Sequence, residues 1–207
     1  MKKLTLYTNP HSRGTNVRWM LEECGAHYET VGLAYGTTMK QADYLAINPM
    51  GKVPALKVDD AVITETAAIL TWLAERYPEK ALIPEAGSDA RGEYYRWLCF
   101  ALHLEYAAVD RMRTIENSTE LRTAIGYGDF DTAFAVLKAR LQDRAHIIGE
   151  QFTALDLYYS GLLQWLIQRA QVLPADSVYL DYMNRHLARP AHQRAIALDE
   201  ALLAEMG

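Results

Sequence analysis

The sequence predicts two domains: an α/β domain with the element order β-α-β-α-β-β-α, followed by an all-helical domain. Short strand-like runs alternate with helical patterns over the first 80 residues, whereas beyond residue 90 only helical periodicity continues. Proline, glycine and charged residues gather between the two parts, as in an interdomain linker. We therefore place the domains at residues 1–80 and 91–207, with a linker at 81–90.

The first four elements form a β-α-β-α unit. A strand is expected at Leu4–Tyr7, and the apolar spacing over 15–24 indicates a helix that Gly25 can end. A second strand is expected over 28–33, and a short helix over 41–46 is broken by a following Asn-Pro pair. Strand, helix, strand and helix thus follow one another in order.

A hairpin and a helix complete the first domain. The runs 53–58 and 61–64 read as two antiparallel strands, because only Asp59-Asp60 separates them in a tight turn. Apolar residues at helical spacing over 66–77 then indicate a helix that Pro78 stops.

The second domain is predicted to contain helices only. Its helical periodicity runs over residues 91–115, 130–146, 154–170, 178–188 and 191–204. Thr153 and Asp156 have the spacing of a capping box, with aspartate in place of the commoner glutamate. The residues after them are apolar nearly all round, as expected of a central bundle helix.

Composition limits the kind of protein this can be. The chain has 207 residues, half of them hydrophobic, so it can bury a sizeable core. We expect no membrane span, because charged or polar residues interrupt each apolar stretch before it reaches the ~20 residues that a span needs. The N-terminus leads directly into a strand without an export signal, so we expect a cytoplasmic protein.

Charge and cysteine usage argue against further classes. The net charge is −5 and the basic residues are scattered, so nucleic-acid binding has no support. Cys24 and Cys99 lie far apart, with no cysteine or histidine at zinc-ligand spacing beside them. We therefore expect neither a disulfide framework nor a bound metal, and we expect small molecules as ligands.

Two motifs in the first domain carry a resemblance to a known family. Residues 48–56, NPMGKVPAL, resemble the signature of the glutathione transferase superfamily around its cis-proline. Glu65-Thr66 matches its acidic residue followed by a hydroxyl residue. The chain is similar over essentially its whole length to the bacterial-type, two-domain cytosolic members. The resemblance implies a thioredoxin-like first domain, a helical bundle as the second, glutathione as co-substrate without a metal, and a homodimer.

The resemblance also assigns the glutathione contacts. The backbone of Val53, turned by a cis bond to Pro54, would pair with the extended tripeptide. Thr66 would bind the γ-glutamyl carboxylate at a helix N-terminus, and Glu65 the ammonium of the same group. Lys52, or as a second candidate Lys40, would meet the glycyl carboxylate. Taken alone, these residues also fit a strand-opening trans proline, a helix cap and a solvated lysine.

The catalytic group must stabilise a thiolate, because a free thiol with a pKa of ~8.5 is only a few per cent ionised at neutral pH. Ser12 resembles the serine of the serine-type classes, since it lies just before a helix and carries a hydroxyl donor. Tyr7 resembles the tyrosine of the tyrosine-type classes and is the second choice. Ser12 could instead be a turn residue and Tyr7 a core residue, and Thr8, Asn9 and His11 remain open as donors.

The leading hypothesis is a detoxifying glutathione transferase that activates the glutathione thiolate for attack on an electrophilic small molecule or a peroxide. Two alternatives stay open at this point. One is a glutathione-dependent disulfide reductase, since bound glutathione can itself supply the sulfur. The other is a non-catalytic relative that uses the same fold as an interaction or stress-response module.

Overall fold

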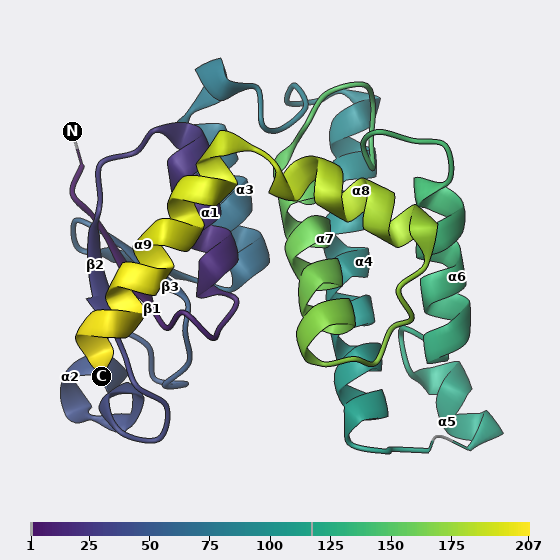
Figure 1. The fold of residues 1–207 in the computed structure, drawn as a ribbon, viewed down its shortest axis with the longest axis horizontal. Coiled ribbons are helices and arrows are strands. Elements are labelled where there is room, and N and C mark those ends of the chain that lie inside the picture. The colour runs from purple at the N-terminus through teal and green to yellow at the C-terminus, as the bar shows by residue number, and fades with distance from the viewer. Residues whose placement is uncertain (1, 117) are drawn as a thin grey trace. The chain divides into compact units, whose positions relative to one another are not determined.

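Packing divides the chain into two compact units. The computed structural model describes residues 2–116 and 118–207. The first unit combines the chain up to Leu82 with Ala188–Gly207, and the second is Ile83–Leu187. The ribbons in Figure 1 show the elements of each unit, coloured along the chain.

The first unit is built on a four-stranded sheet in the order β2-β1-β3-β4. Its strands are β1 (Leu4–Thr8), β2 (Glu29–Gly32), β3 (Ala55–Val58) and β4 (Ala61–Thr64). β1 pairs in parallel with β2 and antiparallel with β3, and β3 and β4 form an antiparallel hairpin. Each predicted strand is therefore present, and the thioredoxin-like arrangement is confirmed.

Helices complete the first unit. They are α1 (Gly14–Cys24), η1 (Thr38–Lys40), α2 (Ala42–Leu45), α3 (Thr66–Arg76), η2 (Pro78–Lys80) and α9 (Pro190–Met206). α1 and α3 pack against each other and bury their apolar faces, including Met20, Leu21 and Leu70. Gly25 ends α1 in the left-handed conformation, as predicted, and its N–H donates to the carbonyl of Glu22.

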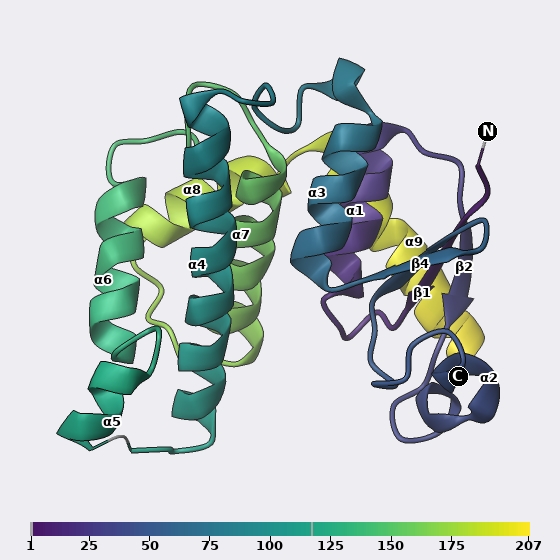
Figure 2. The same ribbon diagram turned by 180° about the vertical axis from the view of Figure 1, so that it is seen from behind.

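The last helix lies in a different unit from the one that the sequence analysis gave it. Residues 191–204 were predicted within the helical domain, whereas α9 belongs to the first unit and packs along α1 (Figure 2). Periodicity shows that a helix has an apolar face, but it does not show which element covers that face. The boundaries 1–80, 81–90 and 91–207 remain predictions for the domains as folding units.

Charged side chains fix α9 to α1. Arg18 Nε donates to Asp199 at 2.7 Å in a buried ion pair. Arg189 contacts Glu23 through two nitrogens, at 2.6 and 2.9 Å. Burial raises the pKa of Asp199, although the Arg18 charge opposes this shift.

The second unit consists of helices, as predicted. They are α4 (Asp89–Met112), α5 (Thr119–Ala124), α6 (Phe130–Leu141), α7 (Ala154–Gln164), a π-helical turn η3 (Trp165–Arg169) and α8 (Ser177–Leu187). α4 lies between α6 and α7 in both views (Figures 1 and 2). The short helix α5 was not predicted, and α4 begins two residues earlier than expected because Ser88 caps it. Among the described residues, none of the helices has the length and hydropathy to cross a membrane.

The capping box at the start of α7 is present. Thr153 N–H donates to Asp156 Oδ2 at 2.8 Å, and the side chain of Thr153 caps the helix in return. α7 is buried nearly all round, and its Tyr159 donates a hydrogen bond to the carbonyl of Trp97 in α4. Both predictions about this helix are confirmed.

The buried Arg18–Asp199 pair gives a stability prediction. Asp199→Ala should lower the free energy of unfolding by about 3–5 kcal/mol, because it leaves a buried guanidinium without its carboxylate. The double variant Arg18→Met/Asp199→Leu should have a free energy of unfolding close to that of the wild type, because it removes both charges together. Urea denaturation measures the difference. Equal losses in the single and double variants would show that the charge pairing does not cause the effect.

Candidate functional site

The sheet brings three segments of the chain together at one end of its strands, which we call the sheet edge. Tyr7 lies opposite Ala55, and Ala55 lies opposite Thr64, so the end of β1, the start of β3 and the end of β4 are neighbours. The loop after β1 therefore leaves the sheet beside Pro54 and Glu65. All of the residues that the sequence analysis assigned to glutathione and to catalysis belong to this edge or to the segments that leave it.

Asn9 organises the loop after β1. Its side-chain Nδ2 donates to the carbonyl of Leu33 at 2.7 Å, and its Oδ1 accepts a hydrogen bond from His11 N–H at 2.9 Å. Its own carbonyl accepts from Ser12 N–H at 2.9 Å. The buried asparagine thus ties the β1–α1 loop to the segment after β2, a positioning role that the sequence analysis did not identify.

Ser12 is half-buried and takes part in the turn that starts α1. Its hydroxyl donates to the carbonyl of Asn9 at 2.7 Å and accepts from Gly14 N–H at 3.0 Å. This is the turn-forming role that sequence reasoning weighed against catalysis. To donate to a sulfur atom, the hydroxyl would have to rotate away from the Asn9 carbonyl.

Thr8 lies beneath the first turn of α1. Its hydroxyl is buried and finds no hydrogen-bond partner within residues 2–116 and 118–207. A Cβ atom added to Gly14 would come within 1.9 Å of this hydroxyl oxygen. The close approach of α1 to β1 therefore depends on the absence of a side chain at Gly14.

Tyr7 packs into a small apolar cluster. Its ring lies 5.6 Å from that of Tyr44, and the cluster also contains Leu33 and Met39. The half-buried ring therefore has a packing role, which was the alternative to a catalytic one.

The segment before β3 adopts the predicted backbone. The Val53–Pro54 bond is cis. Tyr44 and Asn48 both donate to the carbonyl of Lys52, the latter at 2.8 Å, and so hold the chain just before the bond. Val53 is half-buried, while the side chain of Lys52 is exposed.

Lys40, a second candidate for the glycyl carboxylate, binds backbone carbonyls of this chain instead. Its Nζ donates to the carbonyls of Met50 and Gly51, at 3.1 and 3.0 Å. Gly51 has a φ of 56°, and a Cβ there would lie 2.8 Å from this same nitrogen. Lys52 is therefore the better candidate for a ligand carboxylate.

Glu65 and Thr66 stand at the junction of β4 and α3. Glu65 is exposed and has φ 65° and ψ 120°, an unusual backbone for a non-glycine residue. Thr66 is the first residue of α3 and is buried. The first turn of α3 contains no acidic side chain, so the positive end of the helix dipole is available to an anion.

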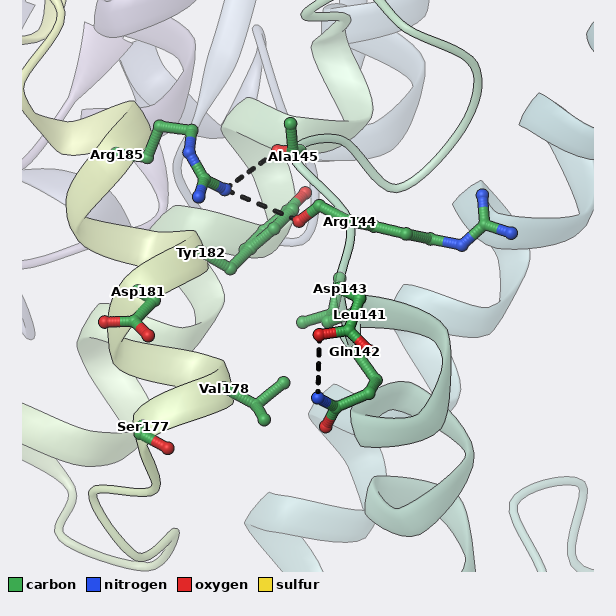
Figure 3. A pocket seen from close by; sticks show the side chains of 10 residues that line it. All are labelled: Leu141, Gln142, Asp143, Arg144, Ala145, Ser177, Val178, Asp181, Tyr182 and Arg185. Carbon is green, nitrogen blue, oxygen red and sulfur yellow. Dashed lines mark hydrogen bonds between the residues drawn. The ribbon is translucent and has the colours of Figure 1, made fainter.

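A pocket of about 470 Å³ lies elsewhere, in the second unit (Figure 3). The end of α6, the segment after it and α8 line it, with Arg144, Tyr182 and Arg185 among the lining side chains. Arg185 donates to the carbonyls of Arg144 and Ala145, at 3.4 Å each. None of the residues that line this pocket is a sequence-predicted site residue, since those residues lie in the first unit.

Comparison with known proteins identifies the family. Residues 2–75 match the family model of the glutathione S-transferase N-terminal domain. Glutathione S-transferase GST-4.5 of Xanthomonas campestris is 31% identical over 170 residues, which cover 77% of this chain and 81% of the relative. The chain belongs to the glutathione S-transferase family.

Solved structures of glutathione transferases have the same fold. A glutathione transferase from Methylococcus capsulatus is 30% identical, with a TM-score of 0.80 over 96% of this chain and 99% of the other. A sphingomonad glutathione S-transferase, solved in complex with glutathione, is 28% identical with a TM-score of 0.78, over 95% and 98% of the two chains. The recognition made from the 48–56 motif and Glu65-Thr66 is therefore confirmed.

Cys24 is unsuited to the nucleophilic role that cysteine-type glutathione transferases use. It lies buried at the end of α1, and burial raises the pKa of its thiol to about 12. A thiol with that pKa stays protonated at neutral pH. Cys24 therefore does not supply a thiolate at neutral pH.

The contact between Gly14 and Thr8 gives a prediction for this part of the glutathione S-transferase fold. Gly14→Ala should lower the free energy of unfolding by about 1–3 kcal/mol, because the new methyl group overlaps the Thr8 hydroxyl. The matched variant Gly92→Ala, on an open face of α4, should raise it by about 0.5–1 kcal/mol. Denaturation curves compare the two, and a stabilised Gly14→Ala protein would contradict the packing described.

Proposed function

We propose that this protein is a glutathione transferase, which binds glutathione at the sheet edge and activates its thiol. The thiolate would attack an electrophilic small molecule or a peroxide. The observation that carries the proposal is the register of β1, β3 and β4, which gathers the β1–α1 loop, Val53-Pro54 and Glu65-Thr66. Metal chemistry is not required, because the reacting group is a thiolate.

Backbone pairing would hold the middle of the tripeptide. A peptide lying extended at a sheet edge can exchange hydrogen bonds with the main chain of Val53, as in strand addition. The hydrogen bonds from Tyr44 and Asn48 to the Lys52 carbonyl support this, because they fix the preceding residue. Exposed Lys52 would meet the glycyl carboxylate.

Electrostatics would hold the γ-glutamyl end. Its carboxylate would lie at the N-terminus of α3, where Thr66 supplies a hydroxyl and main-chain N–H groups point outward. The exposed carboxylate of Glu65 would pair with the ammonium of the same group. The left-handed backbone of Glu65 supports a functional role, because strained residues cluster at ligand sites.

The β1–α1 loop would lower the pKa of the thiol. A shift of about two units, worth ~2.7 kcal/mol, would make the thiolate the major form at neutral pH. Ser12 and the N-terminus of α1 would together supply this lowering of the pKa, and Tyr7 is the second candidate for the hydroxyl donor. When glutathione binds, the Ser12 hydroxyl would give up its hydrogen bond to the carbonyl of Asn9 and donate to the sulfur of glutathione instead.

Relatives named as transferases favour this activity over a disulfide reductase or a non-catalytic module. The proposal includes a homodimer, which rests on the resemblance, and a cytoplasmic location. Nucleic acid and membrane are not among the expected partners.

Thr66→Ala tests the binding site. Loss of one charge-assisted hydrogen bond should weaken glutathione binding by ~1.5–3 kcal/mol, or about 13- to 160-fold. Isothermal calorimetry measures the affinity. Thr71→Ala serves as the control, because Thr71 lies in the same helix and donates to the carbonyl of Ala67. Equal affinities in wild type and Thr66→Ala would remove Thr66 from the site.

Ser12→Ala and Tyr7→Phe separate the two candidate donors. Ser12→Ala should raise the pKa of the thiol of bound glutathione by a unit or more, equivalent to ~1.4 kcal/mol. Tyr7→Phe should leave this pKa unchanged. A spectroscopic titration of the thiolate measures both. The reverse result would make this a tyrosine-type enzyme, and no shift in either variant would assign the role to Thr8, Asn9 or a main-chain N–H.

A further inference from the structure

Three side chains in the second unit bring metal-binding atoms together. They are His146 in the segment before α7, Asp156 in the first turn of α7 and His186 near the end of α8. The two imidazole nitrogens, His146 Nδ1 and His186 Nε2, lie 3.3 Å apart, and His146 Nδ1 lies 3.7 Å from Asp156 Oδ2. All three ligand atoms lie within 4.8 Å of one another.

The separations of His146 Nδ1 from the other two ligand atoms are close to those in a metal site. A tetrahedral zinc ion with ligand distances of about 2.0–2.2 Å holds its ligand atoms about 3.3–3.6 Å from one another. Without an ion, His146 Nδ1 contacts His186 Nε2 at hydrogen-bond distance and Asp156 Oδ2 at ion-pair distance, so the same three atoms face one another. Two imidazoles and one carboxylate, with a fourth position for water, are an established zinc donor set.

The surroundings orient both ligands that are fully buried. His186 Nδ1 lies 3.0 Å from the hydroxyl of Ser160, and a proton held there leaves the lone pair of Nε2 facing His146. Asp156 Oδ1 accepts hydrogen bonds from Tyr182 at 2.7 Å and from Ile147 N–H at 2.8 Å. Such supporting contacts fix the geometry of a metal ligand before the ion arrives.

The charge balance also favours a cation. The side chain of Asp156 is fully buried, and its hydrogen-bond donors, Tyr182, Ile147 and Thr153, are uncharged. A carboxylate buried among uncharged groups is costly in free energy. A divalent ion beside it would offset that cost.

We propose that His146, Asp156 and His186 bind a zinc ion that joins the start of α7 to α8. Asp156 Oδ2 keeps the hydrogen bond from Thr153 N–H at 2.8 Å. The zinc ion replaces the longer hydrogen bond from the Thr153 hydroxyl to Asp156 Oδ2, 3.2 Å. His146 is partly exposed, so the ion enters on its side and water completes the coordination. The site is independent of glutathione binding.

Zinc titration of the full-length, tag-free protein tests the site after treatment with a chelator. It is performed without glutathione, whose thiol binds zinc itself, and in a Cys99→Ser background, because Cys99 is exposed. We expect one zinc ion per chain by calorimetry and a higher Tm with zinc. Cobalt in place of zinc should give the visible spectrum of a tetrahedral site.

His146→Gln should reduce zinc affinity by about 100-fold or more, because loss of a ligand exceeds the 10- to 100-fold effect of losing a supporting contact. His27→Gln, at an exposed histidine of the first unit, should leave it unchanged. Binding in His146→Gln within about tenfold of the parent overturns the proposal. So does a parent protein that binds no zinc, or equal losses in the two variants.

Discussion

The strand register of the first unit is the constraint on which the candidate site depends. Tyr7, Ala55 and Thr64 lie side by side across β1, β3 and β4, so the segments that follow or precede them meet at one edge. A slip of one residue in β3 would exchange the side chains on its two faces and move Pro54 away from the β1–α1 loop. Hydrophobic burial of β1 and β3 thus selects the register that also assembles the site.

Around that edge, polar side chains support the backbone more than they face a ligand. Asn9 holds the loop after β1, and Tyr44 and Asn48 hold the carbonyl before the cis bond. These side chains hold the main-chain segments that would contact glutathione in the proposed function. Ser12 belongs to the same set of side chains, and this explains why its hydroxyl already has two hydrogen bonds.

Asp156 links local and long-range structure in the second unit. Within α7 it completes the capping box with Thr153, and across the unit it accepts a hydrogen bond from Tyr182 of α8. A buried carboxylate with these partners holds the segment before α7 close to α8. The same closeness brings His146 and His186 together, so a helix cap and a candidate metal site share one residue.

The sequence by itself determined the elements and the main motifs: each strand, the helices longer than six residues, the capping box and the NPMGKVPAL and Glu65-Thr66 segments. These are local features, because periodicity, turn residues and short motifs act over a few neighbouring positions. The helix α5 was missed, since its six residues present no buried face.

Only the tertiary structure decided which parts of the chain meet. It showed that α9 packs on α1 through Arg18 and Asp199, and that Asn9 reaches Leu33. It also brought together His146, Asp156 and His186, whose spacing in the chain matches no metal motif. The physical reason is that such contacts arise from packing between elements far apart in sequence, whereas a sequence pattern records only that a face will be buried.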